Sequence, residues 1–195
     1  INREVELNDT GDKYVTSDGV EYTRVSDELA KDDYYKFDKK VDEENKALAL
    51  QWGNEVDGIM RSVLLGQPLE EGTIDASVAQ GIYDEFKKIK ESYPDSIIIP
   101  QITFLNKKKG VAGTADIVVV HKDGSLEILD VKTSRYKFRK TPDPKATKYA
   151  DSYNRHAAQL TMYRALAESQ GFTFVEQGGL KILPIEFTVS EANEV

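Results

Sequence analysis

The stretch Gly113–Ser134, GTADIVVVHKDGSLEILDVKTS, decides how we interpret the whole chain. It holds two apolar runs joined by an Asp-Gly pair at 123–124, which is a strong signal for a β-hairpin. Asp116 stands at the head of the first run, and Asp130 and Lys132 stand at the foot of the second. A hairpin that only had to be buried would need none of these charges.

The predicted hairpin brings the charges together. Asp116 lies about seven residues before the turn centre and 130–132 about seven after it, so antiparallel strands place them side by side. Asp130 and Lys132 emerge on the same strand face, about 7 Å apart. Such a group is costly unless it is paired or binds a cation. On these three residues alone a salt bridge at a solvated sheet end is the simpler interpretation, because short motifs match by chance.

The other elements follow from hydrophobic periodicity and turn residues. Residues 10–24 have the pattern of a small hairpin or an extended lead-in, and Thr73 is the expected N-cap of the third helix. Helical spacing predicts helices over 26–37, 39–66, 73–94 and 150–171, and strand patterns mark 96–106, 113–122, 124–133 and 180–189. The order of helices, three strands, helix and strand predicts a mixed α/β domain with a meander in its sheet.

Composition sets further bounds. The 195 residues fit one domain, 1–195, with a single core. The absence of cysteine excludes disulfides, thiolate catalysis and cysteine-ligated zinc. The net charge of −8 argues against a surface that is basic throughout. No apolar run is long enough for a bilayer and no secretory leader is visible, so we expect a cytoplasmic protein without a membrane partner.

One basic segment stands out in this acidic chain. Residues 132–148 hold seven Lys or Arg side chains against the single acid Asp143, with Tyr136 and Phe138 among them. Alone, such a run is most simply a solvated loop. Cations interleaved with aromatic side chains are also typical of segments that contact nucleic acid.

A pattern on the predicted late helix completes the motif. Gln159 and Tyr163 have i, i+4 spacing, and His156 lies one turn earlier on the same face. Asp116, then D-x-K at 130–132, then Q-x-x-x-Y resembles the PD-(D/E)XK nuclease superfamily, in particular its RecB-like and lambda-exonuclease-like branch.

The resemblance covers residues 48–187 and treats 1–40 as an N-terminal extension. It implies a restriction-endonuclease-like core: a mixed central sheet with a three-strand meander, a helix and a further strand, flanked by helices. It also implies a Mg²⁺ or Mn²⁺ cofactor.

Site roles follow from the same resemblance. Asp116, Asp130 and the main-chain carbonyl of Val131 would be metal ligands, and Lys132 the catalytic lysine. Gln159 and Tyr163 would line the site. The basic loop then lies at the mouth of the site, and its nucleic-acid contacts would come from Arg135, Lys137, Arg139 and Lys140, together with His156 on the helix.

Two positions depart from the RecB-like pattern. Where that branch usually has G-x-x-x-H on the early helix, this chain has GNEVD, so Asp57 stands in place of the histidine. Where many members have a glutamate on the first core strand, this chain has Gln101. Both would still offer oxygen to a hard metal. The departures leave open lower metal affinity, or an inactive or specialised member.

The expected activity is therefore a metal-dependent DNA exonuclease in recombination, repair or phage DNA processing. Its substrate would be DNA, linear and double-stranded or otherwise with ends. Two alternatives stay open: a site-specific endonuclease on the same fold, and a catalytically silent nucleic-acid-binding module. The motifs leave homo-oligomerisation, digestion polarity and the choice between DNA and RNA open.

Overall fold

The computed structural model describes residues 5–8, 10–31, 43–69, 72–134 and 152–186. Its helices are α1 (Val25–Ala30), α2 (Glu43–Leu65), α3 (Ala76–Glu91) and α4 (Ser152–Ser169). Its strands are β1 (Val5–Leu7), β2 (Lys13–Thr16), β3 (Glu21–Arg24), β4 (Ile97–Asn106), β5 (Val111–Val120), β6 (Leu126–Ser134) and β7 (Leu180–Glu186).

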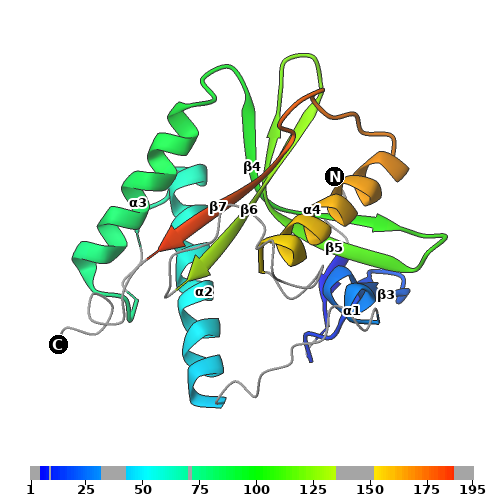
Figure 1. The fold of residues 1–195 in the computed structure, drawn as a ribbon, viewed down its shortest axis with the longest axis horizontal. Helices are drawn as coiled ribbons and strands as arrows, with labels where there is room; N and C mark the ends of the chain where they lie inside the picture. Colours follow the sequence, from blue (N-terminus) through cyan, green and yellow to red (C-terminus); the bar gives the residue numbers. More distant parts are fainter. Residues whose placement is uncertain (1–4, 9, 32–42, 70–71, 135–151, 187–195) are drawn as a thin grey trace.

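The centre of the sheet is the predicted meander. Strands β4, β5 and β6 follow one another in antiparallel pairing, and after α4 the chain returns as β7, parallel to β6. Figure 1 shows β6 and β7 side by side, with β6 ending next to α2. The expected mixed α/β architecture, with meander, helix and strand, is confirmed.

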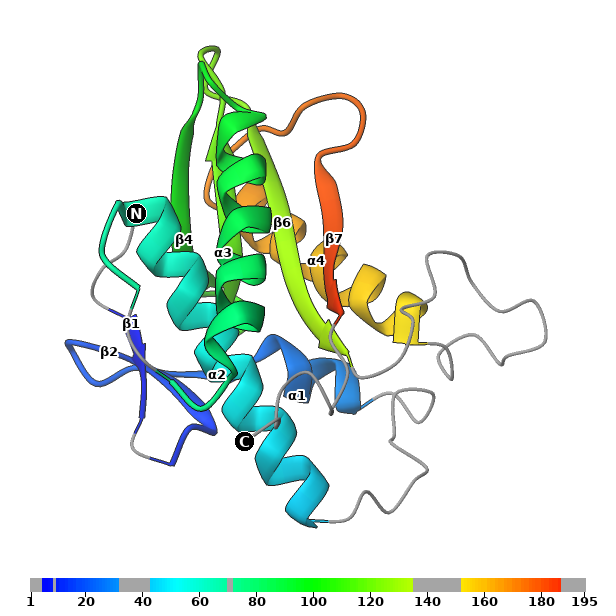
Figure 2. The same ribbon diagram turned by 90° about the vertical axis from the view of Figure 1, so that its left-hand side faces the viewer.

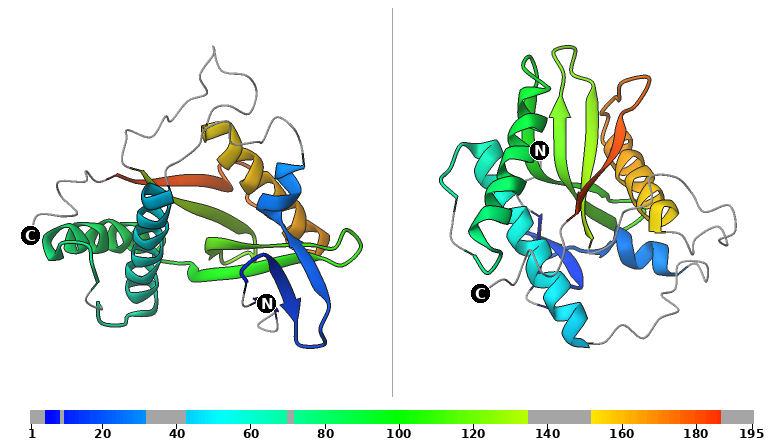
Figure 3. Two further views of the ribbon diagram at one scale, coloured as in Figure 1. Left: turned by 90° about the horizontal axis from the view of Figure 1, so that it is seen from below. Right: turned by 60° about the vertical axis from the view of Figure 1, so that its left-hand side comes forward.

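Helices cover both faces of this sheet. On one face α2 and α3 bury a core that includes Trp52, Met60 and Phe86 against Ile117 and Leu129 of the sheet. On the other face α4 and α1 bury a second core, formed by residues such as Leu160, Tyr163, Val25 and Ile128. Figure 2 shows α2 and α3 in front of β4 and β6 with α4 behind, and Figure 3 shows α3 and α4 on opposite sides of the sheet.

Strand β5 has a fork along one edge. Strand β4 pairs with β5 from end to end. The opposite edge is shared by β3, which pairs with Val111 and Ala112, and by β6, which pairs from Ile117 to Val120. Residues 113–116 lie between these two partners, so their backbone and side chains can serve other groups at this point of the sheet.

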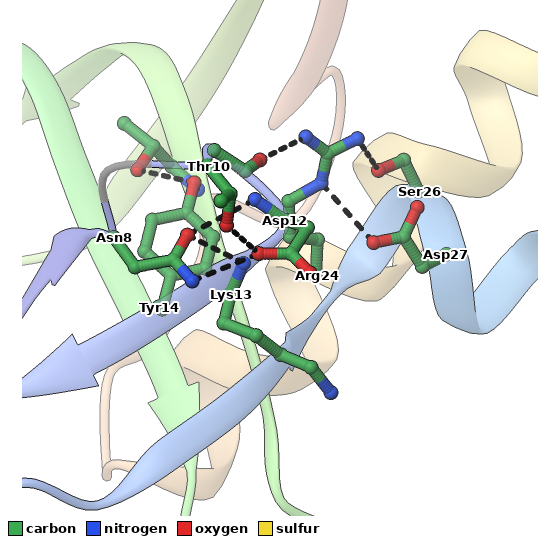
Figure 4. Close-up of polar contacts among 10 residues, drawn as sticks. Asn8, Thr10, Asp12, Lys13, Tyr14, Arg24, Ser26 and Asp27 are labelled. Atoms are coloured by element: carbon green, nitrogen blue, oxygen red, sulfur yellow. Dashed lines mark hydrogen bonds and ion pairs between the residues drawn. The ribbon is translucent and has the colours of Figure 1, made fainter.

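The N-terminal strands close one side of the fork. The Tyr14 hydroxyl donates to Thr114 Oγ1 at 2.8 Å and accepts from the Thr114 backbone N–H at 3.2 Å. At the end of β3 the Arg24 guanidinium donates to Gly11 O at 2.5 Å and to Ser26 Oγ at 3.1 Å, and it pairs with Asp27 at 3.2 Å. Figure 4 shows this arrangement, which holds the β2–β3 hairpin against α1.

The predicted 10–24 hairpin is confirmed as β2 and β3, but β1 was not expected. Its three residues carry too little pattern to stand out. Pairing of β3 with β5 joins these strands to the central sheet, although residues 1–40 were treated as an extension. Helix α1 begins at Val25, and residues 32–37 of the helix predicted over 26–37 lie outside the described residues.

The expected N-cap of α3 was wrong. Asp75, not Thr73, caps the helix, because its carboxylate accepts from the backbone N–H of Ser77 and Val78. Thr73 instead donates its hydroxyl and its N–H to the Glu55 carboxylate on α2. Both residue types are good caps. The tertiary contact with Glu55 decides between them.

Among the described residues no helix is both long enough and apolar enough to cross a membrane.

Candidate active site

The register of the β5–β6 hairpin places its aspartates together. The last ladder pair is Ile117 with Leu129, so Asp116 and Asp130 come next as facing residues. Beyond that pair the ladder stops, and Asp116 Oδ2 accepts the backbone N–H of Val131 at 2.6 Å. The side chain of Asp116 thus takes the place of a missing ladder bond and is fixed where the strands part.

Asp130 is the most buried charged side chain of this group. It is 1% exposed, and its Oδ2 lies 2.7 Å from Lys132 Nζ. The Lys132 side chain is 21% exposed, so its ammonium connects the buried carboxylate to the surface. The carboxyl groups of Asp116 and Asp130 also alter each other's ionisation. Two acids and one lysine therefore form a single contact group.

This group has more negative charge than its lysine can balance. Burial, followed by the charges of Asp130 and Asp57, raises the pKa of Asp116 to about 8, against the opposing effect of Lys132. Burial also raises the pKa of Asp130, although Lys132 favours its charged form. Neighbouring carboxyl groups that cannot all ionise retain a proton at neutral pH. A divalent cation would replace that proton.

Asp57, on α2, belongs to the same electrostatic group. Burial raises its pKa, the Asp130 charge raises it further, and Arg61 and Lys132 lower it. Asp57 on α2 therefore influences the ionisation of Asp116 and is itself influenced by Asp130. The departure from histidine thus leaves an oxygen donor at this position.

Gln101 faces Asp116 across β4 and β5. The ladder pairs the residues on either side of them but skips this position. Gln101 has a φ of 52°, which side chains other than glycine rarely adopt. Ala115 and Val118 are three positions apart and both pack on the α4 side of the sheet. In a regular strand they would face opposite sides, so the alternation of side chains in β5 is broken between them. The exposed Gln101 amide oxygen accepts from Arg61 Nη1 at 3.5 Å.

Helix α4 contributes polar residues to the candidate active site. Gln159 Nε2 donates to the Tyr163 hydroxyl at 2.5 Å, and Tyr163 is 5% exposed. Burial and the nearby Asp130 raise the pKa of Tyr163, so the phenol stays neutral. Burial and the charge of Lys132 lower the pKa of His156 to about 3, so its imidazole is neutral as well.

The sequence also matches a known protein family. The model of the PD-(D/E)XK nuclease superfamily matches residues 23–193. The chain belongs to that superfamily. Searches of curated protein sequences and of solved structures gave no match. PD-(D/E)XK membership implies a nuclease that acts on nucleic acid, generally with a divalent metal ion such as Mg²⁺ or Mn²⁺.

The donor set of this PD-(D/E)XK chain fits such an ion. Carboxylate and carbonyl oxygens are the ligands that Mg²⁺ and Mn²⁺ prefer. The proton retained by the Asp116–Asp130 pair marks the place where positive charge is lacking. Among the described residues, however, no three acidic or histidine side chains converge closely enough to hold a metal as they stand. Lys132 also occupies one oxygen of Asp130.

The structure brings together most of the predicted site residues. Asp57, Asp116, Asp130 and Lys132 influence one another electrostatically. Lys132 acts on His156, and Asp130 acts on Tyr163, which accepts a hydrogen bond from Gln159. Gln101 reaches the rim, where it contacts Arg61 instead of the aspartates. The predicted nucleic-acid contacts Arg135, Lys137, Arg139 and Lys140 lie outside the described residues.

Two residues near the site were missed by sequence reasoning. Arg61 follows Asp57 at i+4, a spacing that could have drawn attention to it. Tyr14 is 100 positions away from its partner Thr114, and no local pattern connects the two. Only the folded sheet brings Tyr14 and Thr114 together.

Proposed function

We propose that this PD-(D/E)XK nuclease is a metal-dependent DNA exonuclease of the RecB-like type, which degrades DNA from its ends. The observation that supports it is the contact group of Asp116, Asp130 and Lys132 at the fork of the sheet. Gln159 and Tyr163 on the facing helix complete the motif. Recombination, repair or phage DNA processing would supply such ends.

Each residue has a role that its surroundings suit. Asp116 and Asp130, with the Val131 carbonyl and Asp57, would hold Mg²⁺ or Mn²⁺. The bound metal would polarise a phosphoryl oxygen and acidify a water. The Lys132 ammonium is partly exposed beside the metal ligands and would offset charge that develops on the phosphate.

The residues of α4 would orient the substrate strand. The Gln159 amide holds the Tyr163 hydroxyl in one direction. Because Tyr163 and His156 are both neutral, they can hydrogen-bond to a nucleotide without adding charge to the carboxylates. The polar residues of α4 would therefore position a nucleic-acid strand, while Lys132 and the metal would act on its phosphate.

A catalytically silent nucleic-acid-binding module is the second candidate. Two observations favour it: the described residues show no convergence of three metal-binding side chains, and Gln101 contacts Arg61 at the position where relatives have a glutamate. In that case Lys132 would only neutralise Asp130. The two candidates differ in whether removal of Lys132 abolishes an activity.

The test is digestion of linear and circular double-stranded DNA with Mg²⁺ or Mn²⁺, with Lys132→Ala in parallel. Lys122→Ala is the matched control, because Lys122 is exposed at the turn of the same hairpin and pairs with Asp95 at 2.9 Å. Loss of linear DNA only, abolished by Lys132→Ala and not by Lys122→Ala, is the expected result. Cleavage of circles would indicate an endonuclease, and no cleavage of any DNA the silent module.

A further inference from the structure

A groove of about 290 Å³ lies along α2, and its lining includes Arg61, which acts electrostatically on Asp57 of the candidate active site. One wall is a stripe of the helix with Asn54, Glu55, Gly58 and Arg61, and the floor includes the apolar side chains of Leu69 and Ile74. This volume is at the lower end of the range for small-ligand pockets. A groove of this size suits one nucleotide of a single strand.

Arg61 links the groove to the carboxylate group. It lines the groove, and its Nη1 donates to the Gln101 amide oxygen at 3.5 Å. Gln101 in turn faces Asp116 in the register of β4 and β5. The bond is long and both side chains are exposed, so an incoming anion can displace Gln101 from the guanidinium.

Gly58 has no structural reason to be a glycine. It lies inside α2, where glycine is a poor helix former. Its φ is not positive, and an added Cβ would meet no atom within 4 Å. The missing side chain therefore leaves the helix backbone open at the wall of the groove. A glycine in such a place permits a close approach by a ligand.

Charge favours an anionic ligand at the Arg61 end of the groove, because the Glu55 carboxylate that also lines it is already hydrogen-bonded by Thr73 and Ile74. At the fork three carboxylates, Asp57, Asp116 and Asp130, would repel a phosphate strand, and the whole chain carries a net charge of −8. A strand needs cations on its path to reach Lys132. The planar Arg61 guanidinium is suited to bind a phosphate through two parallel hydrogen bonds.

We propose that the α2 groove binds the nucleotide next to the scissile phosphate, with its phosphate on Arg61 and its sugar or base over Gly58. Gln101 holds Arg61 in place until the strand arrives. The assignment rests on the proposed nuclease function and adds a binding subsite on the α2 side.

The first test measures DNA binding in a Lys132→Ala background with Mn²⁺, using a fluorescent oligonucleotide. Adding Arg61→Ala should weaken binding roughly tenfold and reduce the slope of log K against log salt by about one. Arg61→Lys should keep the slope and lose part of the affinity. The matched control is Arg164→Ala, because Arg164 pairs with Glu168 on the outer side of α4. Equal affinity and slope for Arg61→Ala and the Arg164→Ala control would overturn the proposal.

The second test fills the groove. Gly58→Leu should leave the melting temperature unchanged or higher, because leucine favours the helix, and should still weaken DNA binding. Gly81→Leu is the matched control, since Gly81 is exposed inside α3 and also has free space around it. Gly58→Leu protein that is folded and binds DNA like the Gly81→Leu control would contradict the assignment.

A chemical test places the contact. A neutral methylphosphonate replaces one phosphate at a time near each DNA end, and binding is measured for Lys132→Ala protein with and without the additional Arg61→Ala change. At one linkage the neutral group should weaken binding only when Arg61 is present. An equal loss in both proteins at every linkage would overturn the Arg61 contact. If unmodified protein neither binds nor cleaves any nucleic acid, the proposed function fails and the subsite with it; intact cleavage with an inert Arg61 would overturn the subsite alone.

Discussion

Gln101 combines an unfavourable backbone with a position next to the candidate metal site. Its φ of 52° lies in the left-handed region, where the Cβ of most residues is crowded. It is also the one position between Ile97 and Asn106 where the β4–β5 ladder is interrupted. Strain of this kind persists where the surroundings hold it and is often found at functional sites.

Because of this strain, substitutions at Gln101 should change the free energy of unfolding. Gln101→Gly should raise the free energy of unfolding by up to about 1 kcal/mol, because glycine adopts positive φ freely. Gln101→Val should lower it by about 1–2 kcal/mol, because a β-branched side chain fits this region worst. Ile97→Gly, at an exposed position of the same strand, is the control and should destabilise. Urea unfolding measures all three, and a destabilising Gln101→Gly would contradict the strain.

The raised pKa of Asp116 predicts a pH dependence for metal-free protein. The folded state keeps the Asp116 proton up to a pKa of about 8, whereas the unfolded chain releases it near 3.8. Between these values the folded state binds more protons, so this contribution to stability falls as pH rises from about 4 to about 8. Thermal unfolding in EDTA should show the decline, and Asp116→Asn should reduce it. An unchanged profile in Asp116→Asn would contradict the assignment to this side chain.

Metal should reverse that trend. Mn²⁺ competes with the proton for the same oxygens, so the rise in Tm on adding Mn²⁺ should grow between pH 6 and 8. Asp116→Asn and Asp130→Asn should lose most of this rise. Asp123→Asn, at the exposed turn of the same hairpin, is the control and should retain it. The same rise in all four proteins would show that the ion binds elsewhere.

At the scale of whole elements, the docking of α4 on β5 depends on one glycine. A Cβ at Gly113 would lie 2.6 Å from Tyr163 Cε1 and 2.7 Å from Val25 Cγ2. Both distances are shorter than real contacts allow, so α4 and α1 can approach the strand only because position 113 has no side chain. The same approach carries Gln159 and Tyr163 to the aspartates.

Gly113→Ala should therefore push α4 away from the sheet. We expect a loss of about 1–3 kcal/mol in unfolding free energy, the usual cost of overpacking, together with reduced cleavage. Tyr163→Ala in the same chain should recover part of that loss, which a double-mutant cycle in urea measures. Additive effects of the two changes would show that the ring of Tyr163 is not what Gly113 accommodates.

The other end of the same hairpin shows what a structural charge group looks like. Buried Glu127 accepts from the Tyr93 hydroxyl at 2.6 Å and from Lys181 Nζ at 3.0 Å, which tie β7 and the segment after α3 to β6. His121 lies 3.7 Å from its second oxygen. Here one acid has several partners, whereas at the fork the two aspartates of the hairpin share Lys132. That difference in charge balance supports a metal at the fork.

At the scale of the whole molecule, the net charge of −8 makes the basic segment 132–148 the expected place for contacts with DNA phosphates. Glutamate at Arg135, Lys137 and Arg139 should weaken DNA binding and flatten its salt dependence, because fewer counterions are released. The control is the triple reversal at 107–109, three exposed lysines in the β4–β5 turn. Fluorescence anisotropy over a salt series measures both. Equal slopes in the two triple variants would remove the segment from the substrate path.

Much of this molecule could be predicted from local pattern. Counting from the Asp-Gly turn predicted that Asp116 lies opposite 130–132, and the observed register, which pairs Ile117 with Leu129, puts it opposite Asp130. Period-two and helical spacing identified the meander and the elements around it. Capping was less predictable, because Thr73 and Asp75 have similar chemistry and only the contact with Glu55 separates them.

By itself, then, the sequence determined the hairpin, the order of elements and the motif residues, because turn chemistry and side-chain periodicity act between near neighbours. Tertiary structure alone decided that Arg61 meets Gln101, that Tyr14 reaches Thr114, and that β5 forks between β3 and β6. These contacts join segments 40 to 100 positions apart. Their geometry depends on how helices and strands pack, which no short stretch of sequence records.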